Sequence, residues 1–164
     1  MPFQTKVSAE IARGIPGQRY GGNPISHVFP TPVAGPGGVR VGYFAWADPA
    51  DVSGRTVINT GTGKPLGIVQ REKTVRLGAD EEATMLIPEG CAVPTVRAGE
   101  RIIAPRTAAV YGHKVFATQA IRQPVTGDAG DAVAGTVEST FSVRQAAAAD
   151  QPGLACPIHA HNHR

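Results

Sequence analysis

The sequence predicts an all-β fold, a sandwich or a barrel of short strands, and three observations lead to it. The chain has 164 residues, which suits one domain with a self-sufficient core. The 20 Gly and 14 Pro together make 34 residues, about a fifth of the chain against ~12% in an average protein, and favour turns over long helices. Between residues 39 and 144, turn-forming stretches separate short apolar runs, and some of these runs alternate apolar and polar side chains as strands do.

The first strand is expected at 39–47, directly after a glycine-rich stretch in the sequence AGPGGVRVGYFAWAD, residues 34–48. A phosphate-binding loop would need a helix start or a P-loop lysine after the glycines, and neither follows. Instead the side chains alternate with a period of two. The residues on one side of the expected strand are Val39, Val41, Tyr43, Ala45 and Ala47, and those on the other side are Arg40, Gly42, Phe44 and Trp46. The glycines are therefore interpreted as a turn into a strand, with Trp46 expected in the core.

Further strands are expected wherever an apolar run stands between turn signals such as NTGTGKP or TGDAGDAVAG. Their expected positions are 56–59, 66–72, 74–78, 84–87, 92–97, 101–104, 113–122 and 136–144. The last one alternates most clearly. It places Val137, Ser139, Phe141 and Val143 on a face expected to be buried, and Thr136, Glu138, Thr140 and Arg144 on a face expected to be wet.

The composition divides the chain into three parts. Residues 1–38 are expected to form an extended Pro/Gly-rich N-terminal arm, because five prolines between residues 16 and 36 remove amide donors. Such an arm becomes ordered only against its own domain or a neighbouring subunit. Residues 39–144 are expected to form the β domain, and 145–164 a flexible C-terminal tail.

Charge and apolar runs argue against several classes of partner. The formal net charge is +3 with no basic block, so neither nucleic acid nor an anionic membrane is expected to bind. No stretch has the length of a membrane span or the pattern of a secretory signal, which predicts a soluble protein made in a cytoplasm. The two cysteines, Cys91 and Cys156, are expected to be free thiols.

No recognised catalytic motif occurs, so we expect no catalytic, cofactor-binding or metal-binding residues and no enzymatic activity. The adjacent acids Asp80, Glu81 and Glu82 are interpreted as a solvated corner. His27 and His113 each stand alone and are interpreted as structural or exposed side chains. The alternating histidines of the tail, His159, His161 and His163, form a weak metal signal because a zinc site usually needs four ligands from an ordered scaffold.

Several segments resemble the structural cement proteins of tailed phages, which decorate the shell of the major capsid protein. The segments MPFQTKV, GNP, AGPGGVRVGYFAWAD, VINTGTGKPLGIVQRE, ATMLIPEGCAV and RAGERIIA occur in the same order as their counterparts. The resemblance covers most of residues 1–144 and does not include the tail. It implies a compact β-barrel or jelly roll, made in the bacterial host cytoplasm, that sits on the outer surface of the head and bridges capsid subunits.

The resemblance also implies partners: the major capsid protein and further copies of the chain, as a homodimer in preference to a homotrimer. Aromatic and arginine side chains tend to anchor interfaces. The interface residues expected from the arm are Phe3, Arg13, Arg19, Tyr20 and Phe29.

Two other functions stay open: another virion part of the head-completion or tail type, and a carbohydrate-binding β module. The second has little support, because its usual aromatic platform would have to come from few candidates, chiefly Tyr20, Tyr43, Tyr111 and Trp46.

Overall fold

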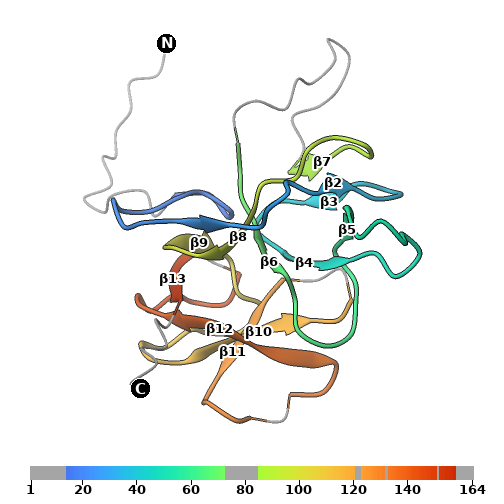
Figure 1. Ribbon diagram of the computed structural model, residues 1–164. Helices are drawn as coiled ribbons and strands as arrows, with labels where there is room; N and C mark the ends of the chain where they lie inside the picture. Colours follow the sequence, from blue (N-terminus) through green and yellow to red (C-terminus); the bar gives the residue numbers. More distant parts are fainter. Residues whose placement is uncertain (1–13, 73–84, 121–122, 132, 151, 158–164) are drawn as a thin grey trace, which may run out of the picture.

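A computed structural model describes residues 14–72, 85–120, 123–131, 133–150 and 152–157 (Figure 1). These residues form strands and no helix, which confirms the all-β prediction. None of them belongs to a helix long and apolar enough to cross a membrane. The strands group into three sheets, which hold six, five and two strands.

The six-stranded sheet has the order β1 (Ser26–His27), β8 (Thr95–Ala98), β6 (Gly67–Val69), β4 (Phe44–Ala47), β5 (Thr56–Ile58) and β2 (Val33–Ala34). The five-stranded sheet has the order β11 (Val125–Gly127), β10 (Lys114–Thr118), β12 (Thr136–Val143), β13 (Gly153–Pro157) and β9 (Arg101–Ile103). The third sheet pairs β3 (Val39–Arg40) with β7 (Leu86–Ile87). Neighbouring strands are antiparallel except β2 and β5, which are parallel.

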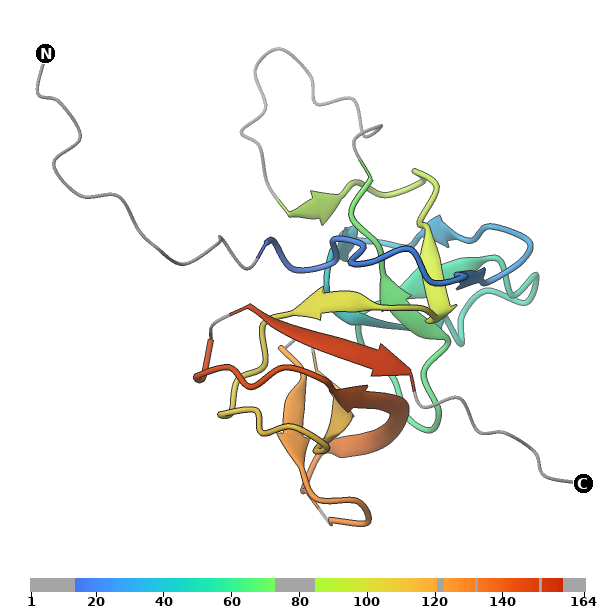
Figure 2. The ribbon, with the colours of Figure 1, turned by 90° about the vertical axis from the view of Figure 1, so that its left-hand side faces the viewer.

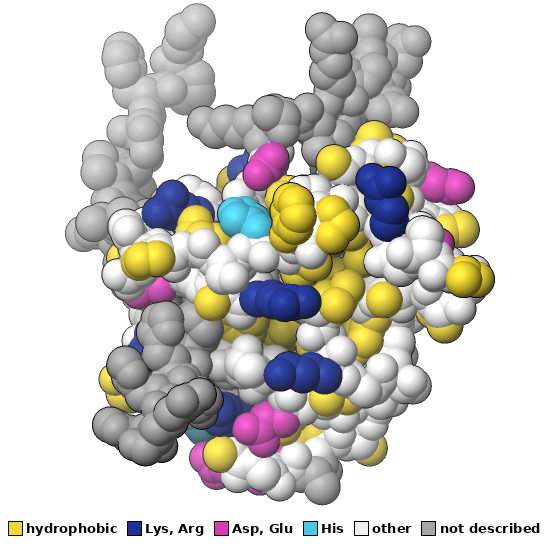
Figure 3. Space-filling model, viewed as in Figure 1, with side chains coloured by type: hydrophobic (Ala, Val, Ile, Leu, Met, Phe, Trp, Pro, Cys, Tyr) yellow, Lys and Arg dark blue, Asp and Glu magenta, His cyan; other side chains and the backbone are white. Residues whose placement is uncertain are grey.

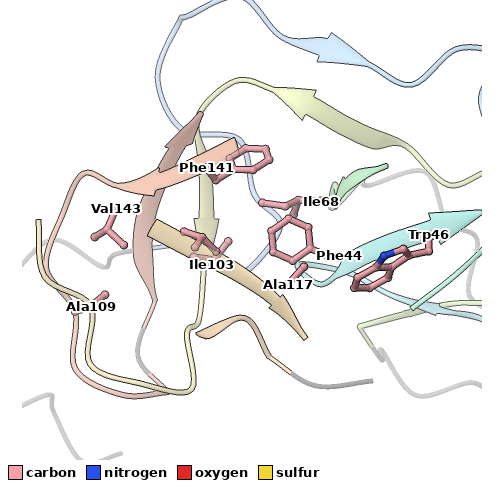
Figure 4. Packing of buried hydrophobic residues seen from close by; sticks show 10 residues of the cluster. Phe44, Trp46, Ile68, Ile103, Ala109, Ala117, Phe141 and Val143 are labelled. Carbon is pink, nitrogen blue, oxygen red and sulfur yellow. The ribbon is translucent and has the colours of Figure 1, made fainter. Parts of the chain in front are cut away.

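Strands β4 and β6 lie between two hydrophobic clusters because their side chains alternate between the two faces of the sheet. Phe44, Trp46 and Ile68 point into a cluster shared with the five-stranded sheet (Figure 4). Ala45 and Val69 belong to a second cluster on the other side, shared with β3 and β7. The six-stranded sheet is therefore the middle layer of the molecule.

The strand expected at 39–47 is divided into β3 and β4 by a turn. Gly42 lies in this turn with φ +80°, a conformation that glycine adopts without the steric cost of a Cβ. A Cβ there would also press against Pro16 and Gly17 of the N-terminal part. The glycine therefore allows the chain to change sheets, which a continuous strand would prevent.

The expected strand at 136–144 corresponds to β12, and its alternation is largely confirmed. Ser139, Phe141 and Val143 are buried, whereas Glu138 and Thr140 are exposed. Ser142 is buried as well, and a register shift lies between Lys114 and Phe116 of the partner strand. The Ser139 hydroxyl donates to the Val115 carbonyl at 2.6 Å and accepts from the Phe141 amide at 3.1 Å, and so satisfies backbone groups at this irregularity.

Two parts of the chain hold strands where the sequence predicts none. In the N-terminal part, β1 and β2 pair with β8 and β5. Near the C-terminus, β13 lies between β12 and β9 although residues 145–164 were expected to be a flexible tail. Strand β11 was also missed. The expected strand at 74–78 and the tail histidines lie outside the described residues.

Candidate functional site

The candidate site is the outer face of residues 14–34, called here the N-terminal segment. Its strands β1 and β2 are the two edge strands of the six-stranded sheet, and its backbone also bonds to β9 at the edge of the five-stranded sheet. The Gly17 amide donates to the Ile102 carbonyl at 2.8 Å, the Val28 amide to the Thr95 carbonyl at 2.8 Å, and the Val33 amide to the Arg55 carbonyl at 2.8 Å. In Figure 2 the segment, in blue, runs along this side of the molecule above β9 and beside β8. The described part of the predicted arm thus lies on its own domain.

Three of the expected interface residues are described, and all three are exposed. The exposed fraction is 50% for Tyr20 and 91% for Phe29, and Arg19 is exposed as well. The Tyr20 amide bonds to Glu100, just after β8, whereas Phe29 follows the contact of Val28 with Thr95 at the start of β8. A strand of four residues is ~13 Å long, so Tyr20 and Phe29 stand at opposite ends of β8. Phe3 and Arg13 lie outside the described residues.

A buried arginine lies beneath the N-terminal segment. Arg101 of β9 is fully buried and forms a backbone bridge with Arg19. Its guanidinium donates to the Gln70 side-chain oxygen at 2.6 Å and to the Glu100 carbonyl at 2.7 Å. Burial, and to a smaller extent the charge of Arg19, lowers the pKa of Arg101 to about 10, so the group is still charged at neutral pH. Nothing in the sequence marked this residue, since burial of a charge depends on the neighbouring strands.

The loop between β4 and β5 presents an apolar side chain on a fixed backbone. The Asp51 carboxylate accepts hydrogen bonds from the Ser53 hydroxyl at 2.6 Å and from the amides of Ser53, Arg55 and Thr56 at 2.8, 3.0 and 2.7 Å. These bonds, that of the Ser53 hydroxyl above all, hold the pKa of Asp51 well below its usual value. Val52, next in the chain, is fully exposed.

A groove opens between the six-stranded and the five-stranded sheets and is called here the inter-sheet groove. Its volume is about 400 Å³, and it is lined by Phe44, Lys64, Pro65, Leu66, Gly67, Arg97, Ser139, Thr140 and Phe141. Figure 3 shows it as a hollow with hydrophobic atoms inside and Lys and Arg side chains beside it. At its base the rings of Phe44 and Phe141 meet edge to face, with centroids 6.1 Å apart.

Titratable groups in the described part of the chain do not gather into a metal site. His27 is exposed, and His113 lies with Nε2 at 3.8 Å from the Asp128 carboxylate. Neither Tyr20 nor Tyr111 lines the inter-sheet groove, so the exposed tyrosines form no aromatic platform there. The described residues thus form a body of the all-β class, with an exposed N-terminal segment and a groove between its two large sheets.

The comparisons with known proteins agree with this class. Residues 3–155 match the family of the structural cement protein (E217 gp24/Pam3 gp6), and the chain belongs to this family. In fold it is similar to a chain in the structure described as the capsid of Myoviridae Phage XM1, with a TM-score of 0.61 and 16% identity over 95% of this chain and 97% of that one. No curated protein matches the chain.

Family membership gives the general role. Structural cement proteins are non-enzymatic virion components. The protein is accordingly a capsid decoration protein of a phage, located in the virion on the surface of the capsid.

Proposed function

We propose that the protein binds the outer surface of the phage head and stabilises it by bridging neighbouring subunits of the major capsid protein. The match of residues 3–155 to the structural cement family is the observation that carries this proposal. The layered body supports it, because a protein with two packed clusters on either side of one sheet deforms little under load.

Bridging stabilises a shell through linkage. A protein that binds the assembled shell and not the separated subunits shifts the equilibrium towards the shell. A molecule that contacts two capsid subunits at once gains ~10²–10⁴ in effective affinity over a single contact. Modest contacts on each subunit are therefore sufficient for firm attachment.

The N-terminal segment supplies the contact surface in this proposal. Tyr20 and Phe29 expose large aromatic side chains on a backbone held by hydrogen bonds to β8 and β9. A side chain on a fixed backbone loses less conformational entropy on binding than one on a free chain. Phe3 and Arg13, which lie outside the described residues, are included in this proposal as further contact residues.

Copies of the protein associate with each other as well in this proposal, as a homodimer. Light scattering of the purified protein over a range of concentrations tests this part separately. A mass that stays at the 17.0 kDa of one chain at every concentration contradicts self-association in solution.

The main test compares phage heads with and without the protein. We expect the protein to sediment with heads that lack it, in hundreds of copies per particle, and to raise the temperature at which the heads break. Heads that break at the same temperature with full occupancy would contradict stabilisation. A few copies per particle would favour a head-completion or tail role instead.

A further inference from the structure

The inter-sheet groove is built from both large sheets, and the family assignment gives it no role. Its apolar part comes from Phe44, Pro65, Leu66 and Phe141. Phe44 and Phe141 are nearly completely buried and hold the base of the groove in place. The base of the groove is thus fixed by the folded core, whereas Lys64, Pro65 and Leu66 come from the loop between β5 and β6.

Two cations, Lys64 and Arg97, lie beside this apolar base, and both are exposed. No acidic residue of the described ranges lines the groove. Among the described residues, the ion pairs involve His113 with Asp128 and Lys114 with Glu138, and neither groove cation takes part in one. A ligand that supplies carboxylates therefore complements the groove in charge.

One wall of the groove also offers a strand edge. Strand β12 pairs with β10 along Thr136–Glu138 and again at Ser142, whereas on its other side it pairs with β13 only at Phe141–Val143. In the described part of the chain no strand pairs with that other side at residues 136–140, of which Ser139 and Thr140 line the groove. An extended segment laid along this edge gains backbone hydrogen bonds.

We propose that the inter-sheet groove binds an extended segment of the major capsid protein whose acidic side chains contact Lys64 and Arg97. This inference rests on the proposed function and adds the chemistry of the partner to it. The competing occupant within this chain is residues 158–164, which follow Pro157. That stretch carries Arg164 and no Asp or Glu, so its charge does not complement the groove.

The first experiment reverses the two charges in the full-length protein. The variant Lys64→Glu/Arg97→Glu is expected to bind heads about 100-fold more weakly, about tenfold for each lost charge-assisted hydrogen bond. The matched control, Arg55→Glu/Arg106→Glu, has the same change in net charge on exposed residues outside the groove. It is expected to keep affinity within about threefold, as for charges that make no direct contact. Circular dichroism and melting curves check that both variants are folded.

The outcomes of this experiment distinguish a failure of the groove assignment from a failure of the proposed function. If wild type does not bind heads at all, the proposed function fails and the groove assignment fails with it. If wild type binds and protects heads but the groove variant binds equally well, only the groove assignment fails. An equal loss in the control variant also overturns it, because attraction would then depend on net charge alone.

The second experiment identifies the occupant. A photoreactive residue is placed at Thr140, which is exposed beside the groove, and the labelled protein is cross-linked on heads. We expect the product to contain a peptide of the major capsid protein with Asp or Glu near the cross-link. Cross-links to residues 158–164, to a second copy of the chain or to a capsid peptide without acidic residues would overturn the proposal. The absence of any cross-link on occupied heads would do so too.

Discussion

The central strands β4 and β6 and the N-terminal segment belong to the same sheet, yet the two regions are held in opposite ways. Phe44, Trp46 and Ile68 are buried on one face of the sheet, and Val69 is buried on the other. The N-terminal segment is attached through backbone hydrogen bonds and, at Ala34, through the second cluster. Many of its side chains, such as Phe29, are exposed. Side chains thus hold the centre together, whereas in the segment they are available for contacts with other molecules.

This difference separates stability from binding. Burial of a large apolar side chain contributes about 1.5–3 kcal/mol to folding, and an exposed one contributes little. Substitutions in the centre should therefore lower the free energy of unfolding, while substitutions of exposed side chains in the N-terminal segment should change attachment to the head. The following predictions test this separation, from the largest expected effect on folding to the smallest.

The largest effect is expected for Phe141→Ala in the cluster between the two large sheets. Phe141 is 2% exposed and contacts Phe44 edge to face. Its truncation leaves a cavity and should lower the free energy of unfolding by about 3–5 kcal/mol. Urea denaturation measures the change. Thr140→Ala, an exposed neighbour on the same strand, is the control and should stay within about 0.5 kcal/mol. Similar effects for both would contradict the assigned core.

Gly67→Ala should be the next most damaging change. A Cβ at Gly67 would clash with the backbone carbonyl of Val96 on the paired strand β8, and a backbone atom cannot move away as a side-chain tip can. We expect a loss of about 1–3 kcal/mol in denaturation, as for other overpacked sites. Gly22→Ala in the N-terminal segment has open space around the added methyl and is the matched control. Equal stability of the two variants would contradict the close pairing of β6 and β8.

A smaller effect that depends on pH is expected at Asp51. Its hydrogen bonds lower the folded-state pKa below the usual 3.8. The stability that the carboxylate contributes is therefore fully present above about pH 4 and is lost as the pH falls towards the folded pKa. Melting temperatures measured between about pH 2 and pH 6 should fall less steeply for Asp51→Asn than for wild type. Parallel curves for the two proteins would contradict the role of this carboxylate.

The smallest effect on folding is expected for Phe29→Ala, together with a clear effect on binding. Phe29 is 91% exposed, so the free energy of unfolding should change by less than about 0.5 kcal/mol. If Phe29 anchors the contact with the capsid, affinity for heads should fall about tenfold or more in co-sedimentation. Tyr111→Ala removes another exposed aromatic, 65% exposed, from a different part of the surface and is the control. Equal binding by Phe29→Ala and wild type would contradict a role of Phe29 in the contact with the capsid.

Arg19, Tyr20 and Phe29 were expected to be interface residues, and their role in binding stays a prediction. The structure shows only that all three are exposed. The inter-sheet groove was not predictable, because Lys64 and Arg97 are far apart in the sequence and come to one groove only through the position of β6 beside β8. The same holds for Arg101, whose burial depends on strands from distant parts of the chain.

The sequence by itself determined the all-β class and the place of most strands, including β12 with its alternating faces. These features are local: a period of two in the side chains and glycine, proline and asparagine in the turns act within a few residues. Only the tertiary structure decided that β4 is buried on both faces, and that β1, β2 and β13 pair with the sheets. The physical reason is that a short strand gains its hydrogen bonds and its burial from a partner strand that is distant in the sequence, so local patterns do not reveal the pairing.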